Sequence, residues 1–183
     1  MESAPAAEAD TGTTAPRRPT ADDIALLGFA QTVEMSARDL YQAALDSGLG
    51  DSDLADVFTT LRDNHKEYAN RLSGILGVDA PQRRDAALFD ELVEGCEGGD
   101  ATAVATAGID LEANIVATHT DLIGRLQGTD GLAALASFLV VEARHGTVLA
   151  DVAGQGDDLD AMLIAGGEPL QPPDGAAAGW RTA

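Results

Sequence analysis

Residues 137–154 read SFLVVEARHGTVLADVAG, an apolar run that carries Glu142 and His145 in its middle. The two residues stand three positions apart, so on a helix both side chains lie on the same face. An ionised carboxylate inside an apolar core is costly unless it is paired, protonated or bound to a metal ion. The stretch therefore predicts a helix that brings a carboxylate and an imidazole to one point of a core.

Three other segments share the helical spacing of apolar residues that this stretch shows. With the helix that contains the stretch, the segments cover about residues 20–46, 52–76, 100–126 and 129–152. The connection over residues 78–99 is long and has room for a short helix at about residues 86–94, whereas QGTDG at 127–131 is a tight turn. This arrangement predicts an all-α fold, an up-down four-helix bundle with a long crossover between the second and third helices.

The two ends of the chain differ from the bundle in composition. Residues 1–20 are rich in Ala, Pro and Thr and lack helical spacing, which predicts a disordered tail that ends where Thr20 caps the first helix. Residues 154–183 are acidic and then rich in Gly, Pro and Ala, with LDAMLIAG at 159–166 as a short segment able to dock. The predicted domain therefore covers residues 21–153.

The composition argues against several classes of partner. Thirty-one acidic residues against eleven basic ones give a formal charge of −20, which disfavours nucleic acid and anionic membrane surfaces. The single cysteine, Cys96, excludes an internal disulfide and a cysteine metal cluster. The sequence has no apolar run long enough to span a membrane and no N-terminal signal segment, so it predicts a cytoplasmic protein. An exported form and a homo-oligomer both stay open.

Each of the other three helices also carries polar residues on its apolar stripe. These are Glu34 on the first helix, His65 on the second, and Glu112 and His119 on the third. Carboxylate and imidazole groups together suit iron, manganese or zinc. We therefore predict a metal site with Glu34, His65, Glu112, Glu142 and His145 as its ligands. His119 is interpreted as a hydrogen-bonded core residue, and Tyr41 and Tyr68 as core residues or contacts of the ligands.

The segments LEANIVATHTDLIGRLQGTDGLAALA (111–136) and FLVVEARHGTVLADVAG (138–154) resemble bacterial ferritin-like domain proteins, a group with desiccation-related and rubrerythrin-like relatives. The resemblance covers about residues 22–152. In such bundles two helices each give one Glu and the other two each give Glu-x-x-His. The resemblance implies a dinuclear iron or manganese site with redox chemistry toward dioxygen or peroxide, with Glu34 and Glu112 as the single glutamates and Glu142–His145 as one Glu-x-x-His.

The second helix departs from this pattern. In LRDNHKEY (61–68) the position three residues before His65 is Arg62, where the pattern has glutamate. Two interpretations stay open: a metal-binding protein with an incomplete site, or a non-catalytic bundle that serves in interaction or stress protection. In the second, the Arg62 guanidinium pairs with Glu34 or Glu142 in place of a metal ion. Arg62→Leu should then cost about 3–5 kcal/mol of stability through an uncompensated buried acid.

Overall fold

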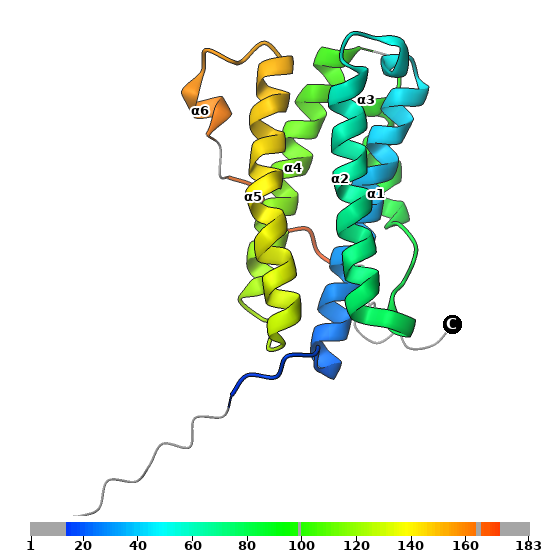
Figure 1. The fold of residues 1–183 in the computed structure, drawn as a ribbon. Helices are drawn as coiled ribbons and strands as arrows, with labels where there is room; N and C mark the ends of the chain where they lie inside the picture. The colour runs from blue at the N-terminus through cyan, green and yellow to red at the C-terminus, as the bar shows by residue number, and fades with distance from the viewer. Residues whose placement is uncertain (1–13, 99, 164–165, 173–183) are drawn as a thin grey trace, which may run out of the picture.

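The computed structural model of the chain describes residues 14–98, 100–163 and 166–172. These residues form the helices α1 (Ala21–Asp46), α2 (Ala55–Leu76), α3 (Ala86–Cys96), α4 (Ala101–Ile123), α5 (Thr129–Val152) and α6 (Leu159–Met162), with short 3-10 turns η1 (Leu49–Asp51) and η2 (Gly77–Asp79). The four long helices α1, α2, α4 and α5 lie side by side as a bundle (Figure 1). The described part of the chain contains no strand, so the predicted all-α bundle is confirmed.

The order of the helices follows the predicted crossover. The turn η1 joins α1 and α2 into one hairpin, and residues 124–128 join α4 and α5 into the other. Between the hairpins, η2 and α3 carry the chain back along the outside of α1 to the end where α2 began, so α2 and α4 run in the same direction (Figure 1). Gly77, with a φ of 60°, ends α2 in a conformation that favours glycine.

A capping box begins α1 and also fixes the turn between α4 and α5. Thr20 Oγ1 accepts from the backbone N–H of Asp23 at 3.3 Å, and Asp23 Oδ2 accepts from the backbone N–H of Thr20 at 2.8 Å. The same buried carboxylate accepts from the backbone N–H groups of Gln127 and Gly128, each at 2.9 Å. Burial alone would raise the pKa of Asp23, but these hydrogen bonds outweigh it and lower the pKa. Asp23 therefore ties the two hairpins together.

Both predicted tails contact the bundle where the structure describes them. The carbonyl oxygens of Pro16 and Arg17 accept from the backbone N–H groups of Thr129 and Asp130, at 2.9 and 3.0 Å. These backbone acceptors take up donors at the start of α5, whose N-cap is Gly128 and has no side-chain cap. Residues 1–13 of the predicted disordered tail lie outside the described residues.

The other predicted tail turns back over the bundle after α6. The carbonyl oxygen of Met162 accepts from Thr147 Oγ1 at 2.9 Å, which holds α6 beside α5. Further on, the backbone N–H of Leu170 donates to Thr118 Oγ1 at 2.8 Å, so this segment lies on α4. Residues 173–183 of the predicted tail fall outside the description.

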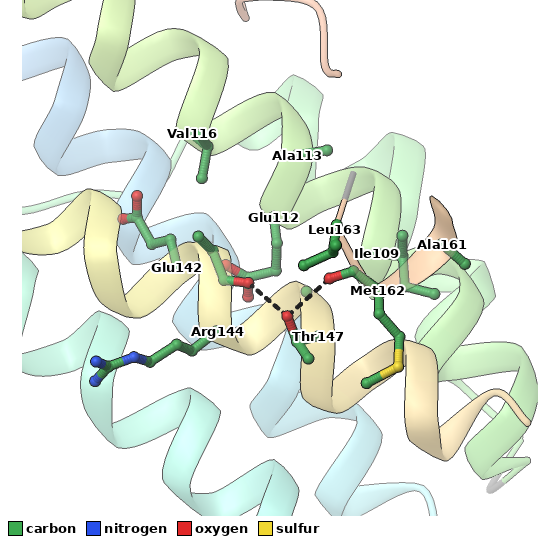
Figure 2. Close-up of a pocket in the computed structure, with 12 residues that line it drawn as sticks. Ile109, Glu112, Ala113, Val116, Glu142, Arg144, Thr147, Ala161, Met162 and Leu163 are labelled. Atoms are coloured by element: carbon green, nitrogen blue, oxygen red, sulfur yellow. Dashed lines mark hydrogen bonds between the residues drawn. The ribbon is translucent and has the colours of Figure 1, made fainter. Parts of the chain in front are cut away.

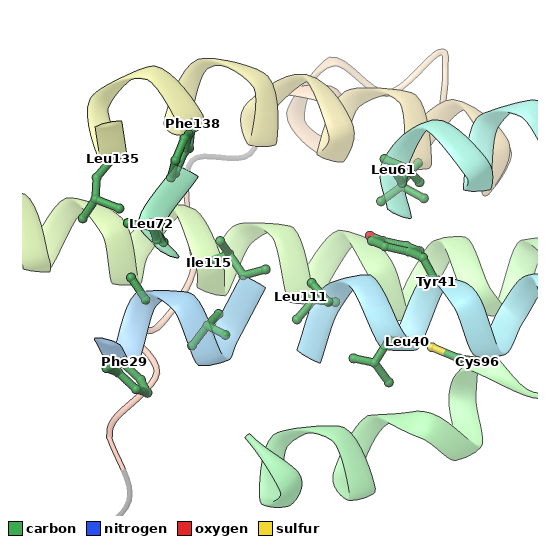
Figure 3. Close-up of a cluster of buried hydrophobic side chains, with 14 of the residues drawn as sticks. Phe29, Leu40, Tyr41, Leu61, Leu72, Cys96, Leu111, Ile115, Leu135 and Phe138 are labelled. Atoms are coloured by element: carbon green, nitrogen blue, oxygen red, sulfur yellow. The ribbon is translucent and has the colours of Figure 1, made fainter. Parts of the chain in front are cut away.

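Apolar side chains pack from both hairpins along the length of the bundle (Figure 3). Leu72, Leu135 and Phe138 gather toward one end, and Leu61, Tyr41, Leu40 and Cys96 toward the other. Close packing depends on Gly108, because a Cβ there would lie 3.0 Å from Leu149 and 3.2 Å from the Tyr41 hydroxyl. The middle of each long helix is thereby enclosed on both sides by apolar layers.

By length and composition, α5 is also the one described helix able to cross a membrane. Its inner face packs on α4 and carries Glu142 and His145, both buried inside the bundle. A core helix of a bundle has the same composition, and the sequence-based exclusion of a membrane stays a prediction.

Candidate metal centre

Six buried polar side chains meet in the middle of the bundle, and all four long helices contribute. Glu34, His65, His119 and Glu142 have no exposed area, Glu112 is 1% exposed and His145 is 5% exposed. Their positions follow from helical spacing, since each residue lies on the stripe of its helix that faces the other helices. The five residues predicted as ligands are therefore brought together, and His119 joins them.

Three of these residues form what we call group one: His65, Glu112 and His145, with one ligand atom from each lying within 4.8 Å of the others. His65 Nε2 lies 3.0 Å from Glu112 Oε1, and His145 Nδ1 lies 3.3 Å from Glu112 Oε2. The Tyr41 hydroxyl donates to Glu112 Oε1 at 2.7 Å. The Asn64 side-chain amide contacts His145 Nε2 at 2.9 Å. Every polar atom of group one has a hydrogen-bond partner.

The other three form group two: Glu34, His119 and Glu142, again with one ligand atom from each within 4.8 Å of the others. His119 Nδ1 lies 3.1 Å from Glu142 Oε2. His65 links the groups, because its Nδ1 lies 2.8 Å from Glu34 Oε2. Imidazoles and carboxylates thus alternate through the core from His145 to Glu142.

Group two has unsatisfied atoms, unlike group one. Among the described residues, three buried side-chain atoms lack a hydrogen-bond partner: Glu34 Oε1, His119 Nε2 and Glu142 Oε1. His119 Nε2 and Glu34 Oε1 lie 3.2 Å apart and form an ion pair when the imidazole is protonated, but no hydrogen bond joins them. Buried polar atoms without partners are rare and costly, and here each residue of group two supplies one. A metal ion would take all three as ligands, so the residues fit a cation.

The charges of group one balance among its members. Burial would lower the pKa of His65, but Glu112 and Glu34 raise it well above its usual value. Burial would raise the pKa of Glu112, but His65 and His145 lower it. The opposed shifts describe an imidazolium between carboxylates, which is a stable arrangement without an ion.

The charges of group two are less well matched. Burial raises the pKa of Glu142 to about 7, with Glu34 adding to this rise and His119 opposing it. Burial would lower the pKa of His119, but Glu142 and Glu34 raise it. Glu142 contacts one imidazole, that of His119, whereas Glu34 also contacts His65, so positive charge is shortest at Glu142.

Arg62 does not enter the centre, and the predicted pairing with Glu34 or Glu142 is wrong. Its guanidinium donates from Nε to Asp63 Oδ1 at 2.9 Å and from Nη1 to Gln42 Oε1 at 2.9 Å, with its side chain 26% exposed. The Arg62 side chain is partly exposed and has both of these partners, so its charge need not be buried. No positively charged arginine compensates the buried carboxylates among the described residues.

The sequence-based site missed the part that His119 plays. His119 forms the hydrogen bond expected of a core histidine, but it also completes group two. Its signal was its place on the same stripe as Glu112, two helical turns further along α4. Tyr41 was interpreted as a core residue or as a contact of the ligands. It contacts Glu112, and its ring stacks on that of His65 with ring centres 5.6 Å apart.

Comparison with known proteins adds one finding. Residues 22–155 match the protein family described as a ferritin-like domain. The matched range contains all six residues of the two groups. No curated protein and no solved structure matches the chain.

Proposed function

The chain belongs to the ferritin-like domain family, and from this premise we propose that its core binds two adjacent transition-metal ions that support redox chemistry. His65, Glu112 and His145 would hold one ion, and Glu34, His119 and Glu142 the other. The observation that carries the proposal is the set of three buried atoms without partners, one from each residue of group two. Buried polar atoms without hydrogen bonds are costly, and a bound cation would take all three as ligands.

The donor atoms suit iron, manganese or zinc, and the proposed redox chemistry selects iron or manganese, because zinc has no redox chemistry. Group one offers two imidazoles and one carboxylate, and group two offers one imidazole and two carboxylates. Mixed nitrogen and oxygen donors suit divalent iron and manganese, whereas magnesium and calcium prefer oxygen alone. Three carboxylates also bring enough negative charge to offset most of the charge of two divalent ions.

The surrounding residues would orient the ligands. The Tyr41 hydroxyl holds Glu112 Oε1, and the contact between His65 Nδ1 and Glu34 Oε2 turns His65 Nε2 toward Glu112. Such outer hydrogen bonds fix the tautomer and the direction of a ligating imidazole. Apolar layers on both sides of the centre exclude bulk water. When bound, a pair of iron or manganese ions would supply one-electron steps toward dioxygen or peroxide.

A second candidate function has its own supporting observation. Group one is fully hydrogen-bonded without an ion, so an internal network of glutamates and histidines can exist without metal. In that case the protein would be a non-catalytic member of the family that serves in interaction or stress protection. Arg62 has no part in this network.

Elemental analysis separates the two functions. The protein is purified without chelators, loaded with Fe(II) or Mn(II), and compared with Glu142→Ala and with Glu67→Ala, a control at an exposed glutamate on α2. We expect the parent and the control to retain about two equivalents of metal, and Glu142→Ala to lose at least one. Sub-stoichiometric metal in all three proteins after loading would favour the non-catalytic network.

A further inference from the structure

The outer face of α5 is mostly apolar, although the chain as a whole is strongly acidic. Of the most apolar 18-residue stretch of α5, 33% is buried within the bundle. The exposed residues of the helix recur at helical spacing along one side, which we call the α5 stripe: Ala133, Ala136, Ser137, Val140, Ala143, Arg144, Val148 and Asp151. Val140 is 56% exposed and Val148 is 43% exposed. Exposed apolar surface of this kind is typical of an interaction face.

The exposed face of α2 is polar by comparison. Its exposed residues are Asp56, Thr60, Lys66, Glu67, Asn70, Arg71 and Gly74. Four of these seven carry a charge, whereas two of the eight residues of the α5 stripe do. Because the chain carries a formal charge of −20, most of its surface repels another copy. At the α5 stripe two copies can approach each other with little repulsion.

The two charges in the α5 stripe are opposite and lie seven residues apart. Seven residues make about two helical turns, or roughly 10 Å along the helix, so Arg144 and Asp151 lie on the same face. Neither side chain forms a hydrogen bond or an ion pair within the described part of the chain. In Figure 2 the Arg144 guanidinium points away from Leu163, which lines the neighbouring groove. Five other described arginines each pair with an aspartate: Arg17, Arg38, Arg62, Arg84 and Arg125.

We propose that the α5 stripe is the interface of a homodimer, in which two copies pack α5 against α5 in opposite directions. A two-fold axis between residues 147 and 148 places Arg144 of one protomer opposite the partner's Asp151, and the same axis forms the second pair. Val148 then lies beside the axis, against the partner's Val148. Parallel packing would instead place Arg144 against the partner's Arg144. The antiparallel arrangement therefore pairs both charges and covers the apolar side chains.

A lipid surface is the other candidate for this apolar face. Asp157, Asp158 and Asp160 follow α5 closely, and they add negative charge beside the stripe. Negative charge disfavours contact with anionic lipids, and a neutral bilayer would leave Arg144 and Asp151 unpaired in an apolar medium. A second copy of the chain supplies one partner for each charge, so it fits the stripe better.

The test measures self-association of the full chain by sedimentation equilibrium in about 0.15 M NaCl, where charges are screened beyond about 8 Å. We expect a reversible equilibrium of monomer and dimer with a dissociation constant of roughly 100 μM or below. The same result is expected with and without a chelator, since no metal takes part in the contact. A chain that stays monomeric up to roughly 500 μM would overturn the proposal, and binding of that monomer to phosphatidylcholine vesicles would assign the face to lipid instead.

Charge reversal tests which residues face each other across the axis. Arg144→Asp places two aspartates opposite each other and Asp151→Arg places two arginines there, so each variant should weaken association by about tenfold or more. The double variant Arg144→Asp with Asp151→Arg forms the pairs in reverse and should associate as the parent does. Lys66→Asp, at an exposed position on α2, makes the same change of charge as Arg144→Asp and should leave association within about threefold of the parent. Equal weakening by Lys66→Asp, or a double variant as weak as the single ones, would contradict the interface.

Discussion

Replacement of His119 tests whether group two needs positive charge. His119 is fully buried and is the only histidine within hydrogen-bonding distance of Glu142. His119→Leu keeps a similar volume but leaves Glu142 beside Glu34 without an imidazole. Breaking a buried pair by removal of one partner costs about 3–5 kcal/mol. Because His119 lowers the pKa of Glu142, its removal raises that pKa further above about 7, and the cost of keeping the carboxylate buried grows as the pH rises.

The measurement is urea unfolding of chelator-treated proteins at pH 8, with Thr120→Leu as a control for an added leucine at an exposed position on α4. We expect His119→Leu to lose about 3–5 kcal/mol of unfolding free energy and the control to lose less than about 1 kcal/mol. The double variant His119→Leu with Glu142→Leu removes the unpaired acid and should recover about 2 kcal/mol relative to His119→Leu. A single variant as stable as the parent, or a double variant that recovers nothing, would refute the reasoning.

Three further predictions concern residues around the centre and the fold. Asp23→Ala should cost about 2–4 kcal/mol, because Asp23 accepts several backbone hydrogen bonds as a buried carboxylate. The pKa of Asp23 in the folded protein lies below 3.8, so the stability that Asp23 contributes is present above pH 3.8 and is lost as the pH falls through the folded pKa. The unfolding free energies of parent and variant, measured in urea, should therefore converge in acid. Arg62→Leu should change the unfolding free energy by less than about 1 kcal/mol, because the Arg62 pairing is at the surface; a loss of 3–5 kcal/mol would show that Arg62 compensates a buried acid. Tyr41→Phe should cost about 1–2 kcal/mol in the metal-free protein by removing the hydrogen bond to Glu112, and an unchanged thermal midpoint would contradict that bond.

Helix positions were largely predictable because they depend on local spacing. The capping box at Thr20, the end of α2 at Gly77 and the long crossover all follow from short-range signals. The meeting of Glu34, His65, Glu112, Glu142 and His145 was predictable for the same reason, since buried stripes of one bundle face a common axis.

The direction of long side chains was less predictable. Arg62 lies on the helix next to the inward stripe, and whether its guanidinium turns inward or to the rim depends on Gln42 and Asp63. The assignment of the ligands to the two groups could not be predicted either, because His119 and Glu112 lie on the same stripe of α4 but belong to different groups. Their assignment depends on which residue of α1, α2 or α5 lies opposite, and spacing along one helix cannot give that.

We propose that the core holds two metal ions, one in each group. Crystals grown with Mn(II) or, under anaerobic conditions, Fe(II) would test it through anomalous scattering near the absorption edge of the metal. We expect two anomalous peaks, one among Glu34, His119 and Glu142 and one among His65, Glu112 and His145. A well-ordered core without an anomalous peak in either group, with the imidazoles and carboxylates still in direct contact, would contradict it.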